Sequence, residues 1–245
     1  MSRRSLAGAL AIVALLTLSL GAAVVGMLRF VPRHHRVAER PPGKERLEQS
    51  QEFLKEFTGM IGEVEISKQL ANNRPDQPWT QQFTFTDEQI NSYLSEGFVQ
   101  QGWADRLPED VSDPRVSFEP DLMHLSFRYK TALMSTVVSI TVKAWVVPSE
   151  GNVVALGLEG FHAGAVPFKA QWLLEKLSDV ARQHDVEVSW YRHEGRPVAI
   201  LRFQPNQPRP LIKLKSVHID EGKLTVSGEL GEKRRTAVSL LAEPR

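Results

Sequence analysis

Apolar and polar side chains alternate with a two-residue period over most of the chain after residue 115. This period is typical of strands that bury one face, and clusters of Pro, Gly, Asn and Asp separate the runs as turns. The longest run, Leu133–Val147, carries Val138, Ile140 and Val142 on one face and Ser139 on the other. We predict strands at residues 81–85, 116–118, 123–129, 133–147, 153–161, 186–191, 198–203, 211–219 and 224–230.

A short helix is predicted from Thr86 to Phe98. Thr86 can accept a hydrogen bond from the backbone of Gln89, and the Gln89 side chain can return it, which makes a capping box. Apolar residues then recur at helical spacing on one face. This face consists of Ile90, Tyr93, Leu94 and Phe98.

Two further helices are predicted from the same periodicity. Lys44 to about Leu70 has apolar residues on one face and charged residues on the other, and residues 72–78 end it with prolines. Pro167 suits the first turn of a helix that continues to about His184. The apolar stripe of this helix consists of Phe168, Trp172, Leu173, Leu177, Val180 and Ala181.

These elements indicate an α+β domain. A sheet with one long apolar face needs a cover, and the helices at 86–98 and 167–184 are the candidates. We therefore predict a strongly curved antiparallel sheet wrapped on one or two amphipathic helices. Either the helices fill the concave side completely, or a slot is left that would accept an acyl chain.

The N-terminal part is predicted to be a transmembrane helix. Leu6–Leu28 contains no charged residue, and Arg3, Arg4 and Arg29 flank it. At about 1.5 Å per residue, 23 helical residues cross a hydrocarbon core of about 30 Å. A cleaved signal peptide is the alternative, but its apolar region is usually about 7–15 residues long.

The charges around this span give conflicting signals about orientation. More basic residues follow the span than precede it, which by the positive-inside rule favours a cytoplasmic domain. A short tail, one span and a long soluble domain is instead the layout of an exported protein. We expect a single-pass membrane protein with its large domain on the extracytoplasmic side.

The basic, proline-containing segment Val31–Gly43 is predicted to be a solvated tether, because its prolines oppose a helix and its charges oppose burial. The chain then divides into an anchor (1–30), this tether (31–43), a linker helix with its break (44–78) and the α+β domain (79–245). Basic side chains near the span can contact anionic headgroups. These membrane-surface candidates are Arg29, Arg33, Arg36, Arg40 and Lys44.

Composition and motifs argue against several functional classes. The net charge is +1, and the basic residues form no aromatic-interleaved patch, which opposes nucleic-acid binding. The chain has no cysteine, so disulfides and thiolate chemistry are excluded. No phosphate loop, HExxH or GxSxG occurs, and the neighbouring His34 and His35 lack a third metal ligand. We expect no enzyme activity, no cofactor and no metal.

Two stretches of the chain resemble bacterial membrane-anchored proteins of the YpmS-like and YceB-like kind, which are similar to the tubular lipid-binding (TULIP) superfamily. One is Phe83-Thr-Phe-Thr-Asp-Glu-Gln-Ile-Asn-Ser-Tyr-Leu94, after an N-terminal span. The other is the hairpin Val217-His-Ile-Asp-Glu-Gly-Lys-Leu-Thr-Val-Ser-Gly228. The resemblance implies an apolar groove for lipid and a structural role for Asn91. The proline-rich segment 204–210 departs from that pattern.

We therefore expect a non-enzymatic protein that binds or shields a lipid or other amphiphile at the cell envelope. An envelope assembly module with a filled core, which binds a protein partner or a second copy, is the alternative; an enzyme without a recognisable motif is a third. The candidate groove residues are Ile90, Leu94, Phe98, Leu125, Phe127, Ile140, Val142, Trp172, Leu173 and Leu177.

Overall fold

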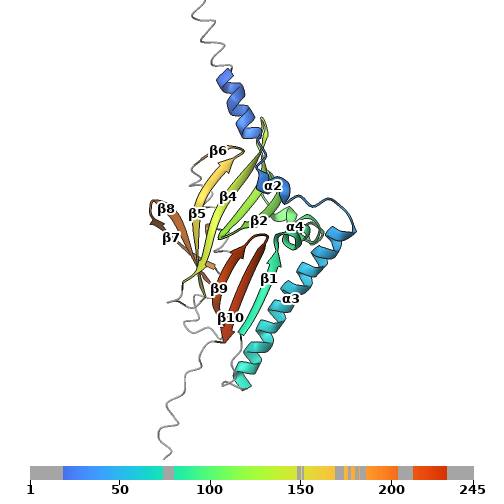
Figure 1. Cartoon of the computed structure of the whole chain (residues 1–245), viewed down its shortest axis with the longest axis vertical. Coiled ribbons are helices and arrows are strands. Elements are labelled where there is room, and N and C mark those ends of the chain that lie inside the picture. Colours follow the sequence, from blue (N-terminus) through green and yellow to red (C-terminus); the bar gives the residue numbers. More distant parts are fainter. Residues whose placement is uncertain are drawn as a thin grey trace, which may run out of the picture.

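The fold is α+β, with helices gathered along one edge of a large antiparallel sheet (Figure 1). The computed structural model describes residues 19–73, 80–147, 150, 152–168, 174–175, 178–179, 182, 186–203 and 212–230. The predictions that fall elsewhere, among them residues 6–18 of the expected span and the residues 204–210 crossover, lie outside the described part.

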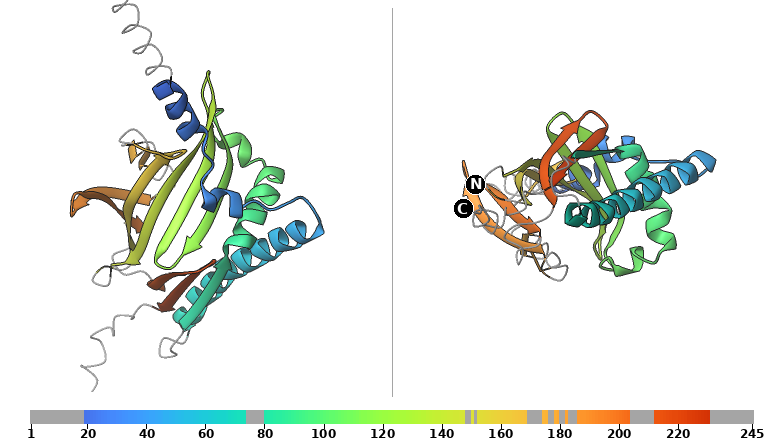
Figure 2. Two further views of the ribbon diagram at one scale, coloured as in Figure 1. Left: turned by 45° about the horizontal axis from the view of Figure 1, so that its top comes forward. Right: turned by 90° about the horizontal axis from the view of Figure 1, so that it is seen from below.

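The large sheet has seven strands in the order β2-β3-β4-β5-β8-β7, and the short β6 pairs with β5. All of the pairings are antiparallel, as the alternation predicted. Figure 2 shows β7 and β8 turned steeply away from β2–β4. The strands are β2 (Val111–Glu119), β3 (Leu122–Lys130), β4 (Ser135–Val146), β5 (Val153–Ala163), β6 (Val166–Pro167), β7 (Val186–His193) and β8 (Arg196–Phe203).

A second, three-stranded sheet accounts for the remaining strands, whereas the sequence was interpreted as a single sheet. Its order is β1-β10-β9, so the first strand of the domain pairs with the last described strand. Ile219 of this sheet is buried against Val116 and Phe118 of β2, which joins the two sheets. The strands are β1 (Thr80–Thr86), β9 (Ile212–Asp220) and β10 (Lys223–Leu230).

Two helices pack in succession against the edge of the large sheet at β2. The predicted linker helix is confirmed as α3 (Lys44–Asn73). The predicted capping-box helix is also confirmed: α4 (Asp87–Ser95) begins after Thr86, whose side chain accepts from the Gln89 backbone. A kink at Glu96 separates it from α5 (Gly97–Gln100), and the short 3-10 helix Ala104–Arg106 leads into β2.

The expectation that Val31–Gly43 is a solvated tether is wrong at its centre. Residues 33–37 form a helix, α2 (Arg33–Val37), that begins directly after Pro32. Pro32 sits at the N-cap, where its missing N–H costs no helical hydrogen bond. His35 is 0% exposed and Ala38 is also buried, so this segment packs on the domain.

Residues 19–29 are helical, and their side chains up to Met27 are exposed. The exposed apolar side chains include Leu20, Val24, Val25 and Met27. Over the described residues, no helix combines the length and hydropathy that a bilayer crossing requires.

Candidate functional site: an apolar groove beside α4

The floor of the candidate site is the apolar face of β3, which continues onto β4. Their antiparallel register places Leu125 opposite Ile140 and Phe127 opposite Val138. Since residues at the same register of neighbouring strands point to the same face, these side chains form one continuous apolar surface. Met123 links this apolar surface to the core, because its side chain packs against both buried clusters.

The wall of the site is α4, and Asn91 fixes its position. The Asn91 amide donates to the carbonyl of Val116 over 2.6 Å, and the Val116 N–H donates to Asn91 Oδ1 over 2.8 Å. The side chain thereby pairs with the edge strand β2 as another strand would. Because Asn91 is 1% exposed, this pair is shielded from water and α4 is held against β2.

Together these elements enclose an apolar groove of about 350 Å³, which is within the size range of ligand sites. It opens to solvent at Leu125, which is 36% exposed although its neighbours are apolar. The lining residues come from α4, β2, β3 and β10: Ile90, Leu94, Pro114, Arg115, Val116, Phe118, Met123, Leu125, Ser126, Phe127 and Leu224.

Four of the predicted groove residues meet at this site: Ile90, Leu94, Leu125 and Phe127. Two others, Ile140 and Val142, share the apolar face but are buried in the core with Leu158, Phe161 and Leu174. Trp172, Leu173 and Leu177 lie outside the described residues.

The prediction for Phe98 is wrong. The kink at Glu96 ends α4 before this residue, so Phe98 leaves the face that Ile90 and Leu94 share. Its ring lies edge-on to that of Tyr93, with centroids 6.4 Å apart, and Tyr93 packs against Phe53 of α3. Phe98 therefore belongs to the aromatic contact between α3 and α4 rather than to the groove.

A second cavity, of about 780 Å³, lies at the opposite end of the same sheet face. Its apolar wall includes Phe161, Phe168, Leu174 and Trp190, and Trp190 donates a hydrogen bond to Ser178 over 2.6 Å. Charged residues of β5, β8 and the 174–182 segment also line it, among them Arg182 and an ion pair between Arg196 and Glu159. This cavity is more polar than the groove beside α4.

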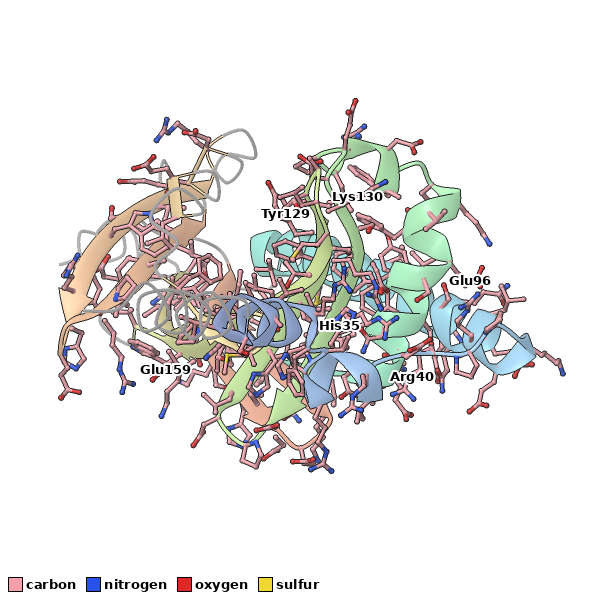
Figure 3. All side chains as sticks on the ribbon, turned by 90° about the horizontal axis from the view of Figure 1, so that it is seen from above. His35, Arg40, Glu96, Tyr129, Lys130 and Glu159 are labelled. Carbon is pink, nitrogen blue, oxygen red and sulfur yellow. The ribbon has the colours of Figure 1, made fainter. Side chains whose placement is uncertain are left out.

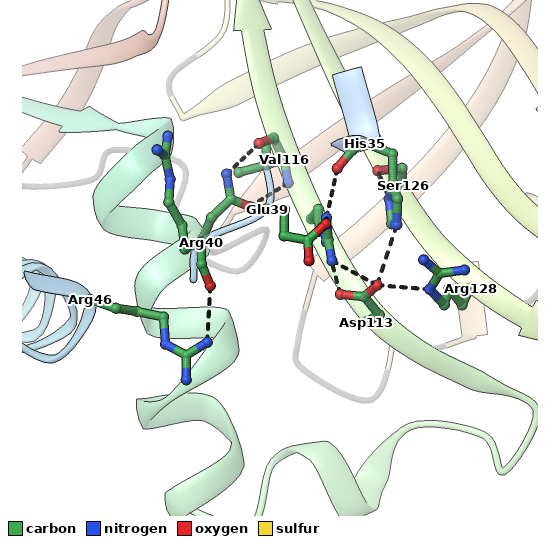
Figure 4. A network of polar contacts seen from close by, with 10 residues as sticks. His35, Glu39, Arg40, Arg46, Asp113, Val116, Ser126 and Arg128 are labelled. Carbon is green, nitrogen blue, oxygen red and sulfur yellow. Dashed lines mark hydrogen bonds and ion pairs between the residues drawn. The ribbon is translucent and has the colours of Figure 1, made fainter. Parts of the chain in front are cut away.

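The opposite face of the sheet carries a buried polar network that sequence analysis missed (Figure 4). His35 of α2 lies 2.8 Å from the Ser126 hydroxyl and 3.3 Å from Asp113, and Arg115 and Arg128 also bond Asp113. The signal was present in the sequence as alternating polar residues on β3 and β4. Nothing local in the sequence indicates that α2 covers this face of the sheet.

One carboxyl group and one imidazole near α2, those of Asp113 and His34, have clearly displaced pKa values. Burial alone would raise the pKa of Asp113, but hydrogen bonds from His35 and Arg115 outweigh it and hold the pKa well below its usual range. Burial, with help from the neighbouring His124 and His35, lowers the pKa of His34 to about 4. Near neutral pH, Asp113 is therefore ionised and His34 is neutral.

The basic residues proposed for the membrane surface separate into two groups. Arg29, Arg33 and Arg36 are exposed, next to the helix of residues 19–29. Arg40, which follows α2, instead pairs with Glu88 of α4 at 3.1 Å, and Lys44 pairs with Glu48 along α3. Among the residues described, no three His, Asp or Glu side chains are grouped as metal ligands.

Comparisons with protein-family models, with curated proteins and with solved structures gave no match.

Proposed function

We propose that this protein is a single-pass membrane protein whose α+β domain binds the acyl chain of a lipid or another amphiphile, without chemical conversion. The observation that carries the proposal is the convergence of Ile90 and Leu94 of α4 with Leu125 and Phe127 of β3 around one apolar groove. A TULIP-like arrangement, in which a curved sheet wraps around helices, is part of the proposal and is supported by the sequence resemblance.

The energetics of the groove favour an apolar ligand. An acyl segment that removes about 200 Å² of apolar surface from water would gain about 5 kcal/mol, at about 25 cal/mol per Å². Arg115 is the charged residue among the described lining residues, but its side chain belongs to the network on the opposite face, where it donates to Asp113 at 2.8 and 3.0 Å and to the His35 carbonyl. Its charge is already neutralised, so it is poorly suited to bond-making chemistry.

The membrane anchor in this proposal is Leu6–Leu28. Its described part supports the idea, because Leu20 is 68% exposed and Met27 53% exposed on a helix that projects away from the domain (Figure 1). Exposed apolar side chains in such a row are unfavourable in water and favourable in hydrocarbon. We place the domain on the extracytoplasmic side, which protease treatment of intact cells would test.

Binding of a fluorescent fatty acid to the full chain in detergent micelles or nanodiscs tests the groove. Leu125→Trp would fill the opening, and we expect it to weaken binding at least tenfold. Val99→Trp is the matched control, because Val99 is 54% exposed and does not line the groove; it should bind like the wild type. Equal affinities for the two variants would contradict a ligand in this groove.

The alternative, an assembly module that binds a protein partner, has its own observation. Leu47 and Phe57 of α3 are 42% and 40% exposed, so this helix offers two apolar side chains to a partner. Crosslinking of a partner through Phe57, combined with no loss of fatty-acid binding on Leu125→Trp, would favour this alternative over the groove.

A further inference from the structure

The hairpin between β3 and β4 ends in an exposed apolar tip. Leu133 is 91% exposed, more than any other large apolar side chain described. The tip is tightly closed: the Thr131 N–H donates to the Met134 carbonyl over 2.8 Å, and the Met134 N–H donates to the Thr131 hydroxyl over 3.1 Å. The tip therefore satisfies these backbone groups itself, which a segment entering a bilayer interface requires.

This tip is tied to the end of the apolar helix. The Thr136 hydroxyl, at the start of β4, donates to the carbonyl of Leu28. The Ala165 N–H, in the β5–β6 turn, donates to the carbonyl of Met27 over 2.8 Å. Two carbonyls at the C-terminal end of the helix are thus bonded to the sheet, which fixes the helix relative to the hairpin.

The geometry gives the height of the tip. Leu133 lies three residues beyond Thr136, so an extended hairpin carries it up to about 10 Å past the level of Leu28. The same rise along a helix takes about six or seven residues. Figures 1 and 2 show the hairpin pointing to the same end of the molecule as the helix of residues 19–29. A bilayer around that helix would meet the hairpin tip as well.

The residues below the tip suit the headgroup region. Lys130 is exposed and pairs with Ser135 at the base of the turn, and Arg29 is exposed where the helix ends. Figure 3 shows Tyr129 and Lys130 together at this end of the domain. Basic and aromatic residues are enriched at membrane interfaces, where basic side chains are attracted to anionic lipid headgroups.

We infer that the β3–β4 hairpin inserts Leu133 into the lipid interface and, with the bonded helix end, holds the domain in one orientation on the bilayer. This inference rests on the proposed anchor but not on the groove. The orientation directs the same β3 strand that lines the groove, through Leu125 and Phe127, towards the membrane surface. An acyl chain leaving the bilayer would therefore meet the groove along that strand.

Site-specific labelling tests the inference cleanly, because the chain contains no cysteine. We would label Leu133→Cys with an environment-sensitive fluorophore in vesicles of phosphatidylcholine and phosphatidylglycerol. His193→Cys, an exposed position on the β7–β8 hairpin, is the control, and Val24→Cys reports the anchor. We expect nitroxide lipids to quench the labels at Leu133 and Val24. Aqueous iodide should quench the label at His193 severalfold more than it quenches either of those two labels.

A Leu133 label that behaves like the His193 label, with the Val24 label in lipid, would overturn the hairpin contact and leave the anchor intact. Labels at both Leu133 and Val24 in water would overturn the anchor too. A Leu133 label shielded from iodide but not quenched by nitroxide lipid would indicate a protein contact and would also overturn the inference.

Discussion

Asn91 and Val116 exchange two hydrogen bonds through which α4 takes the place of a neighbouring strand at the edge of the sheet. Asn91→Ala would leave the buried N–H and carbonyl of Val116 without partners, at about 1–3 kcal/mol each. We expect the free energy of unfolding to fall by about 2–4 kcal/mol in denaturant titrations followed by tryptophan fluorescence. Gln100→Ala, at an exposed position of α5, should be nearly neutral; an equal loss would contradict the role of Asn91.

The close approach of α5 to α3 depends on Gly97. A Cβ at this position would lie 2.6 Å from Tyr93 Cδ2 and 3.3 Å from the Ser50 hydroxyl oxygen. Gly97→Ala would displace the Tyr93 ring, and we expect a loss of about 1–3 kcal/mol by overpacking. Gly62→Ala in α3, where a Cβ meets nothing within 4 Å, should instead stabilise the helix by about 0.5–1 kcal/mol. A higher thermal unfolding temperature for Gly97→Ala than for Gly62→Ala would refute this packing.

Gly164 is required where the N-terminal helix joins the sheet. Its φ is +61°, and a Cβ would lie 2.2 Å from the Met27 carbonyl oxygen. Gly164→Ala should detach the helix end and speed trypsin cleavage after Arg29 and Arg33. Gly195→Ala provides the matched control, because its φ is +80° but no atom lies within 4 Å of the new Cβ. Gly195→Ala loses only about 1–2 kcal/mol of stability, because alanine is unfavourable in a left-handed conformation. Trypsin cleavage after Arg29 and Arg33 should not change in this variant.

The burial of His34 predicts that the folded protein loses stability in mild acid. His34 stacks on His124 with ring centroids 4.8 Å apart and bonds Ser139, and His35, His162 and Glu119 also face it. Burial, followed by the charges of His124 and His35, lowers its pKa from 6.5 to about 4. Between these values the unfolded chain binds a proton that the folded protein does not, so stability falls as the pH falls.

We expect a loss on the order of 2 kcal/mol between pH 6.5 and 4 after allowing for the partial exposure of His34. His34→Gln keeps an amide that can bond Ser139 but does not titrate, so its stability should change less over this window. Asp113 acts in a separate window, because its contribution is present above its ordinary pKa and is lost only in stronger acid. Identical pH profiles for the wild type and His34→Gln would exclude His34 as the cause.

Local patterns in the sequence were sufficient to predict most elements. The capping box at Thr86 and Gln89 located the start of α4, and the period of two located β3, β4 and β5 with the apolar face that includes Leu125 and Phe127. Four of the eleven described residues that line the groove followed from these faces, because α4 and β3 each present their apolar residues to the same space.

The remaining features depend on contacts between distant segments. The pairing of β1 with β10 joins residues more than 130 positions apart, and no local pattern indicates it. The prolines around Arg33–Val37 argued against a helix, yet Pro32 is favourable just before one. Ser126 and Ser139 alternate with apolar residues, as solvent-facing strand residues do. Both are nevertheless buried, because His35 and His34 bond their hydroxyl groups.

The central claim is that an acyl chain occupies the groove beside α4, and photo-crosslinking with a diazirine-bearing phospholipid tests it most directly. Trypsin separates the relevant regions: the peptide 69–106 contains Ile90 and Leu94, the peptide 116–128 contains Leu125 and Phe127, and the peptide 131–143 contains Leu133. For the full chain in vesicles, we predict labelled residues on the first two peptides, and loss of that labelling in Leu125→Trp. Labelling confined to residues 6–30 and the hairpin peptide would contradict lipid binding in the groove.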